Sequence, residues 1–148
     1  MNDVMPHIKM LGFGGLIPFV ALLSSLLMLQ EDHPWHGIAQ QLLIFYTAII
    51  MTFVGALNWG IALVGEHLSQ GQRKTLLTYS VVPSLIVWCL LLLPADIYLM
   101  TCALLYVACF GIDSRLTLPH MPHEYADMRR KLSFSVAGVL LMSSQLVV

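Results

Sequence analysis

The sequence predicts an all-α, polytopic membrane protein with five transmembrane helices, and three observations lead to this fold class. Apolar residues make up 58% of the chain and charged residues only 10%, whereas soluble domains are about one quarter charged. The apolar residues gather in five long runs. If each run crosses the membrane, all the basic residues lie on the same side of it. This composition excludes a disordered chain, a nucleic-acid binder and a soluble enzyme.

Each of the five apolar runs is close to the ~20 residues that a helix needs to cross the hydrocarbon core of a bilayer. The backbone of a span must satisfy its own hydrogen bonds in lipid, and the runs lack the alternation of a barrel strand. We therefore expect helical spans at about 11–29, 42–64, 76–93, 95–112 and 132–148, within a single domain covering residues 1–148.

The runs differ in what interrupts them. The first contains Pro18 and no charge, and because no small-x-small cleavage site follows it, we expect a retained helix instead of a cleaved signal peptide. The second is broken only by two threonines and Asn58, and the third contains Pro83. Pro94 alone separates the third run from the fourth, which predicts a tight helical hairpin. The fifth follows a helical segment predicted at residues 123–131.

The basic residues predict the orientation of the bundle. Five alternating crossings put all seven lysines and arginines on one side of the membrane, while the loop of residues 30–41 on the other side carries Glu31 and Asp32. Because Lys and Arg resist translocation, we expect the N-terminus in the cytoplasm and the C-terminus outside. The seven residues are Lys9, Arg73, Lys74, Arg115, Arg129, Arg130 and Lys131.

The sequence predicts neither a cofactor nor a metal. The three cysteines lie inside apolar runs without a CxxC motif and are expected to pack in the core. No histidine falls within a predicted span, which argues against haem held between helices. One alternative stays open, a metal on the inner face held by His7, His67, His120, His123 and Asp113. Solvated interfacial histidines are the simpler expectation.

Catalytic residues are not predicted either. The chain has no HExxH motif, no Ser, His and Asp at a shared depth, no paired carboxylates within a span and no phosphate loop. It also lacks the mid-depth ionisable residues that mark a proton or ion path. We therefore expect a protein that is not an enzyme.

The prolines and polar residues of three spans lie at a similar depth, in one layer of the cytoplasmic half of the membrane. This depth is roughly 9–12 Å from the inner end of each span, since a helix rises ~1.5 Å per residue. Each proline frees a carbonyl one turn earlier, and Asn58 or Ser84 is the expected donor to it. Two interpretations stay open: a packing cluster, or a small ligand-binding cavity that opens to the cytoplasm. The residues in question are Pro18, Gly55, Asn58, Trp59, Pro83 and Ser84.

The second run also carries small residues spaced by four, a pattern that lets membrane helices approach closely. They are Ala48, Thr52, Ala56 and Gly60. This pattern favours the packing interpretation.

The inner-face loop predicts an interfacial surface. We expect Asp113 to pair with Arg115 at the end of the fourth helix, and the basic cluster before the fifth helix to meet anionic lipid at ~1 kcal/mol per charge. Docking to a partner subunit is the alternative. The residues of this surface are Asp113, Arg115, Tyr125, Arg129, Arg130 and Lys131.

Several segments, taken in order, resemble one family. They are residues 15–19 (Gly-Leu-Ile-Pro-Phe), 53–60 (Phe-Val-Gly-Ala-Leu-Asn-Trp-Gly), 83–88 (Pro-Ser-Leu-Ile-Val-Trp), Asp113, and 125–129 (Tyr-Ala-Asp-Met-Arg). Over nearly its whole length the chain resembles the small bacterial and mitochondrial membrane proteins grouped with transmembrane protein 69, a domain of unknown function.

The resemblance implies an inner-membrane location and supplies no established activity. It also brings one departure, because Asn58 stands where the family pattern Phe-x-Gly-x-x-His-Trp-Gly has histidine. Asparagine can replace a histidine that donates a hydrogen bond but not one that binds metal or carries protons. The departure favours a structural role for this position.

The sequence therefore predicts an accessory, assembly or scaffold protein of the bacterial inner membrane, or of the mitochondrial inner membrane in a eukaryote. Its expected partners are the lipid bilayer and either other inner-membrane subunits or a second copy of the chain. The alternative is a binder or carrier of a small ligand, lipid or quinone, that uses the cavity in the cytoplasmic half.

Overall fold

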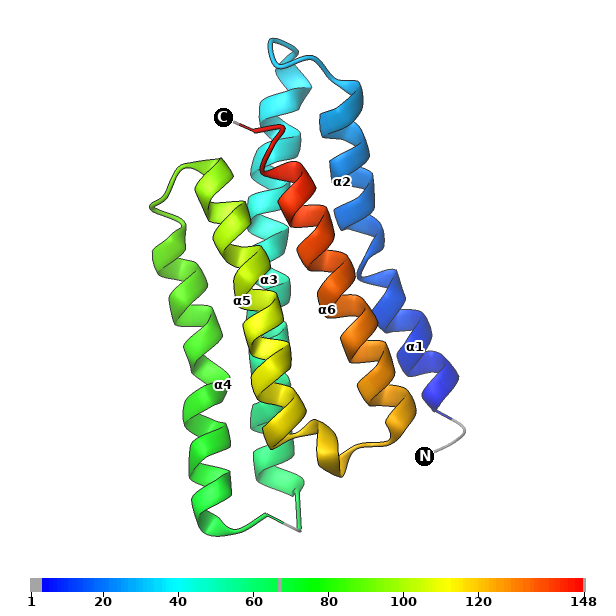
Figure 1. Cartoon of the computed structure of the whole chain (residues 1–148), viewed down its shortest axis with the longest axis vertical. Coiled ribbons are helices and arrows are strands. Elements are labelled where there is room, and N and C mark those ends of the chain that lie inside the picture. Colours follow the sequence, from blue (N-terminus) through cyan, green and yellow to red (C-terminus); the bar gives the residue numbers. More distant parts are fainter. Residues whose placement is uncertain (1–3, 67, 148) are drawn as a thin grey trace.

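The structure, a computed structural model, describes residues 4–66 and 68–147. Throughout this part of the chain the regular structure is helical, which confirms the all-α class (Figure 1). The elements in order are α1 (Met5–Gly14), α2 (Ile17–Met28), α3 (Pro34–Val64), α4 (Gln70–Leu90), α5 (Ala95–Leu116), the short 3-10 helix η1 (Leu118–His120) and α6 (His123–Ser143).

The helices run up and down in one elongated bundle. The turn between α3 and α4 and the start of α1 lie at the lower end in Figure 1, and the C-terminus lies towards the upper end. Helix α3 packs most extensively on α4, and α5 on α6, while α1 and α2 pack against α6 and α2 also against α3. This arrangement places α3, α5 and α6 around the core.

Three helical segments are long and apolar enough to cross a membrane, namely Met5–Met28, Pro34–Val64 and Ala95–Leu116. The chain is therefore a multi-pass membrane protein by length and composition. Helices α4 and α6 lie alongside these segments, but polar residues in their first turns lower their mean hydropathy.

The helices begin earlier than the apolar runs predict. Helix α3 starts at Pro34 instead of residue 42, and α4 at Gln70 instead of 76, whereas the start of α6 at His123 confirms the helical segment predicted at residues 123–131 before the fifth apolar run. Polar caps mark two of these starts. The His33 side chain accepts from the backbone N–H of Trp35 before α3, and Ser69 and Gln72 form a reciprocal capping box before α4. Hydropathy marks where lipid begins, whereas helix propensity and caps mark where the helix begins. At the other end, α6 stops at Ser143 instead of continuing to the predicted limit.

The first predicted span is two helices with a break at residues 15–16. Pro18 at the start of α2 has no N–H to donate to the carbonyl of Gly14, and at this break the neighbouring carbonyl of Gly15 accepts a hydrogen bond from the Tyr46 hydroxyl at 2.8 Å. The expectation that Asn58 or Ser84 would serve the broken helix is wrong here. The donor is a tyrosine on α3.

The core is built around side chains that are almost completely buried. Tyrosines on α5 reach across it, with Tyr98 donating to the carbonyl of Ile44 at 3.1 Å and Tyr106 to that of Thr47 at 3.3 Å. Two of the three cysteines are buried as predicted, whereas Cys89 on α4 is exposed. The largest apolar members of the core are Phe19, Leu43, Met51, Leu76, Leu99 and Leu140.

Arg73 on α4 closes the end of α3. Its guanidinium donates to the carbonyls of Ala62 at 3.0 Å, Leu63 at 3.2 Å and Gly65 at 2.8 Å. These are the last carbonyls of α3 and its cap, which have no partners within the helix. Arg73 therefore ties the end of α3 to the first turn of α4.

We expect Arg73→Gln to lower the free energy of unfolding by about 2 kcal/mol, because hydrogen bonds from a charged donor contribute about 1.5–3 kcal/mol. Titration of the purified protein from mild detergent into dodecyl sulfate measures this quantity. The neighbouring exposed residue supplies the control, since Lys74→Gln removes the same charge. Equal losses in the two variants would mean that the carbonyl bonds of Arg73 contribute nothing.

Candidate functional site

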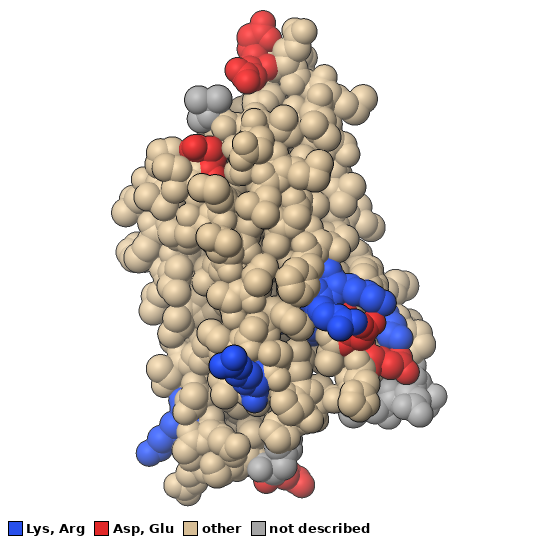
Figure 2. All heavy atoms as spheres, in the orientation of Figure 1, with Lys and Arg blue, Asp and Glu red and all other residues tan. Residues whose placement is uncertain are grey.

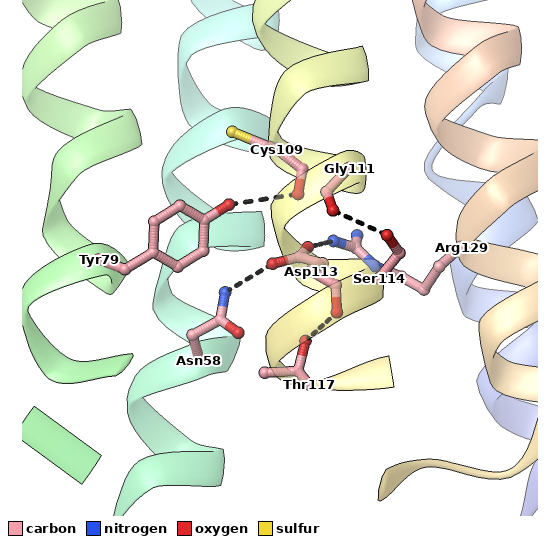
Figure 3. A network of polar contacts seen from close by, with 8 residues as sticks. All are labelled: Asn58, Tyr79, Cys109, Gly111, Asp113, Ser114, Thr117 and Arg129. Atoms are coloured by element: carbon pink, nitrogen blue, oxygen red, sulfur yellow. Dashed lines mark hydrogen bonds and ion pairs between the residues drawn. The ribbon is translucent and has the colours of Figure 1, made fainter. Parts of the chain in front are cut away.

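A buried ion pair joins the inner ends of α5 and α6. Asp113, in the last turn of α5, lies 2.7 Å through its Oδ2 from an Nη2 donor of Arg129 in the second turn of α6 (Figure 3). The side chains are 3% and 10% exposed, respectively. Taking such charges out of water costs several kcal/mol per ion unless each is paired and hydrogen-bonded. Each charge here therefore depends on the other.

Neighbouring helices contribute further polar groups to the same region. The amide of Asn58 on α3, itself 3% exposed, donates to Oδ1 of Asp113 at 3.3 Å. Tyr79 on α4 donates to the carbonyl of Cys109 at 3.3 Å, and Thr117 donates to the carbonyl of Asp113 at 3.0 Å. Figure 3 shows Asn58 and Tyr79 approaching α5 from one side and Arg129 from the other. Both carboxylate oxygens of Asp113 have a donor, so α3, α5 and α6 meet at one satisfied carboxylate, and α4 contacts α5 one turn earlier through Tyr79.

The predicted layer of the cytoplasmic half is only partly assembled. Gly55 and Pro83 lie against each other: a Cβ built at Gly55 would be 3.5 Å from the proline ring and 2.6 Å from the carbonyl oxygen of Ser80. Trp59 points outward with 47% of its surface exposed, and the Ser84 hydroxyl bonds to Val81 within its own helix.

Asn58 is buried, but its described hydrogen bond goes to Asp113 and not to a carbonyl freed by a proline. Pro18 lies at the first turn of α2, where the tyrosine contact completes the broken helix. The predicted layer therefore divides into a helix-packing contact and a separate ion-pair cluster.

The interfacial residues also differ from expectation. Arg115 is exposed, and the ion-pair partner of Asp113 is Arg129 instead, because Arg115 lies only two residues on and points away from the aspartate on the helix. Arg130 and Lys131 pair with Asp127 one turn earlier on α6, at 2.5 and 2.8 Å. The prediction that the basic cluster before the fifth span meets anionic lipid is wrong for Arg129, because this residue is buried.

Two groups near the start of α6 titrate away from their ordinary values. The hydrogen bond from Lys131 holds the pKa of Asp127 below its usual range. Burial raises the pKa of the Tyr125 hydroxyl, against the opposing effect of the nearby Arg129. At neutral pH Asp127 is therefore charged and Tyr125 is neutral.

The histidines do not assemble a metal site in the part of the chain that the structure describes. Within residues 4–66 and 68–147, no group of three His, Cys, Asp or Glu residues has the geometry to hold a metal ion. His67, one member of the hypothetical inner-face site, lies outside these residues.

The fold and the buried ion pair define a polytopic helical membrane protein whose internal charges join helices. Residues 4–145 match the family model described as "Protein of unknown function (DUF3429)". The chain belongs to this family. It is also 32% identical over 141 residues to "Transmembrane protein 69" of Xenopus tropicalis. The alignment covers 90% of this chain and 53% of that protein, so the chain spans about half the length of this relative. No solved structure matches the chain.

Proposed function

We propose that the chain is a non-enzymatic accessory, assembly or scaffold protein of the inner membrane. One observation carries this proposal: the carboxylate of Asp113 and the tyrosine hydroxyls of the core are engaged in contacts between helices. Asp113 is engaged by Arg129 and Asn58, and the tyrosines donate to backbone carbonyls. In the described residues the carboxylate of Asp113 is thus engaged in joining helices, which suits a rigid framework better than a general base that acts on a substrate.

Purification of the tagged chain from native membranes, followed by mass spectrometry of the whole complex, tests this function. The accessory proposal expects a larger complex with fixed stoichiometry. Recovery of the chain alone, with a small apolar molecule bound, would contradict it and favour the ligand binder. One observation supports that second candidate, an apolar groove of about 150 Å³ beside Arg129.

We further propose that the chain spans the membrane five times with its N-terminus in the cytoplasm. The basic side chains support this orientation, since Figure 2 shows them only in the lower part of the bundle and acidic ones alone at the upper end. The broken helix α1–α2 serves as the first span, and α3, α4, α5 and α6 as the other four.

An alkaline phosphatase fused after the last residue should be active, because the enzyme folds only outside the cytoplasm. The matched fusion in the turn between α3 and α4 should be inactive, as it lies with Arg73 and Lys74 on the cytoplasmic side. The reverse pattern would refute the orientation, and activity in both fusions would refute the number of spans.

A further inference from the structure

The groove runs along the contact between the broken first span and α6. It has a volume of about 150 Å³, similar to cavities that hold one small apolar molecule, and it is partly open. Two glycines, Gly12 in α1 and Gly15 at the helix break, form part of its wall, and Gly12 lets α1 pack closely on Met128 and Leu132 of α6. Its apolar lining includes Leu11, Leu16, Phe19, Phe53, Tyr106 and Val136.

Two polar side chains of α6 also line the groove, one turn apart. Ser133 is only 6% exposed, and its hydroxyl has no hydrogen-bond partner in residues 4–66 and 68–147. Other helical serines, such as Ser24 and Ser25, donate to the carbonyl four residues earlier. In the described residues the only fully enclosed hydroxyl oxygen without a partner is that of Ser143, so the Ser133 hydroxyl is accessible from the groove that it lines. A ligand acceptor at this point would gain a hydrogen bond that the protein leaves unmade.

Arg129 offers further donors at the same end of the groove. A guanidinium has five N–H groups, and within the described residues the one hydrogen bond of Arg129 goes from Nη2 to Asp113. Both Arg129 and Ser133 can only donate to a ligand that brings oxygen acceptors. Asp113 already neutralises the charge of Arg129, so a negatively charged ligand group would be repelled by the Asp113 carboxylate. An uncharged carbonyl oxygen fits better.

The groove is polar at one end and apolar at the other. Arg129 and Val136 are about 10 Å apart along α6, and Leu11 and Phe19 about 12 Å along the broken span, at ~1.5 Å per residue. The polar end lies next to the charged residues Lys9, Arg130 and Lys131, where the helices leave the apolar zone. An occupant must therefore place its acceptor at the membrane interface and its apolar part towards the bilayer centre.

A bilayer glycerolipid has this layout, with ester carbonyls at the interface and chains pointing inward. We propose that the groove binds one acyl chain of a glycerolipid from the cytoplasmic leaflet. The ester carbonyl accepts from the Ser133 hydroxyl and from a free N–H of Arg129, and the chain lies between α6 and the broken span. This site does not depend on the accessory role, because labelling of the groove and recovery of a larger complex are separate results.

The test uses the full chain in vesicles of phosphatidylethanolamine and phosphatidylglycerol that contain a phosphatidylglycerol with a photoreactive diazirine on one acyl chain. After irradiation, mass spectrometry should find the label concentrated on residues 11–19 and 129–136. Ser133→Leu fills the groove and removes the donor, and we expect the label there to fall at least fivefold. Ser135→Leu makes the same change on the exposed side of α6 and should leave the label unchanged.

Three results would overturn the proposal: label spread evenly over all helices, equal labelling of the two leucine variants, or displacement of the label by an equimolar prenylated benzoquinone. The last would assign the groove to a quinone instead of an acyl chain. If Ser133→Leu does not fold, Ser133→Ala removes the hydroxyl without adding volume. It should lower the label at least twofold, and no decrease in that variant would refute the hydrogen bond.

Discussion

Replacing Asp113 with asparagine should lower the free energy of unfolding by about 3–5 kcal/mol, because it leaves the buried guanidinium of Arg129 without a counter-charge. The effect is large since Arg129 is 8% exposed and the pair is enclosed by α5 and α6. Unfolding in mixed detergent micelles, followed by circular dichroism, gives the free energy directly.

Two further variants separate charge burial from a general effect of the substitution. Asp127→Asn makes the same change in an exposed aspartate whose partners are also exposed, and should change stability little. The double variant Asp113→Leu with Arg129→Met removes both charges and should recover most of the loss, since apolar replacement of a buried pair is often neutral. Failure of the double variant to recover would mean that the charges themselves are not the cause.

Gly55→Ala should be the most damaging small substitution in the bundle, with a loss of about 3 kcal/mol. The added Cβ would lie 2.6 Å from the backbone carbonyl of Ser80, so α3 and α4 would have to separate beside Pro83. Overpacking typically costs 1–3 kcal/mol, and backbone atoms cannot move aside as a flexible side chain can.

Gly60→Ala, five residues later on the same helix, is the matched control. A Cβ there meets nothing within 4 Å, and alanine is about 1 kcal/mol better than glycine inside a helix. We therefore expect this variant to be as stable as the parent or more stable. The measurement is the same detergent titration, and similar losses at both glycines would show that α3 and α4 do not touch closely at Gly55.

The fold class followed from the sequence because lipid exposure imposes long apolar runs, and those runs are read easily from one chain. The starts of α3 and α4 could not be predicted from hydropathy, because polar first turns such as residues 70–75 belong to a helix without being apolar. The break in the first span was foreshadowed by Pro18, but the donor that completes it, Tyr46, is set by tertiary packing.

From the sequence, Asp113 was expected to pair with Arg115, and its pair with Arg129 was missed. The segment between α5 and α6 separates Asp113 from Arg129, and in the sequence both residues resemble members of an exposed loop. A signal for the ion pair was present on α6, where Arg129 continues the spacing of the buried residues Ser133, Val136 and Leu140. Arg130 and Lys131 fall outside this stripe, as their exposure shows. A lone aspartate near the end of a span requires a cation, and only the helical register of α6 identifies which arginine supplies it.

The central claim, that Asp113 and Arg129 form a buried pair that joins α5 to α6, is tested most directly by a double-mutant cycle on unfolding free energies. The cycle uses Asp113→Asn, Arg129→Gln and the double variant. We predict a coupling energy of about 2 kcal/mol or more between the two positions, within the range found for residues in direct contact. The same cycle with Arg115→Gln should give a coupling near zero. Coupling of Asp113 to Arg115, and none to Arg129, would contradict the structure.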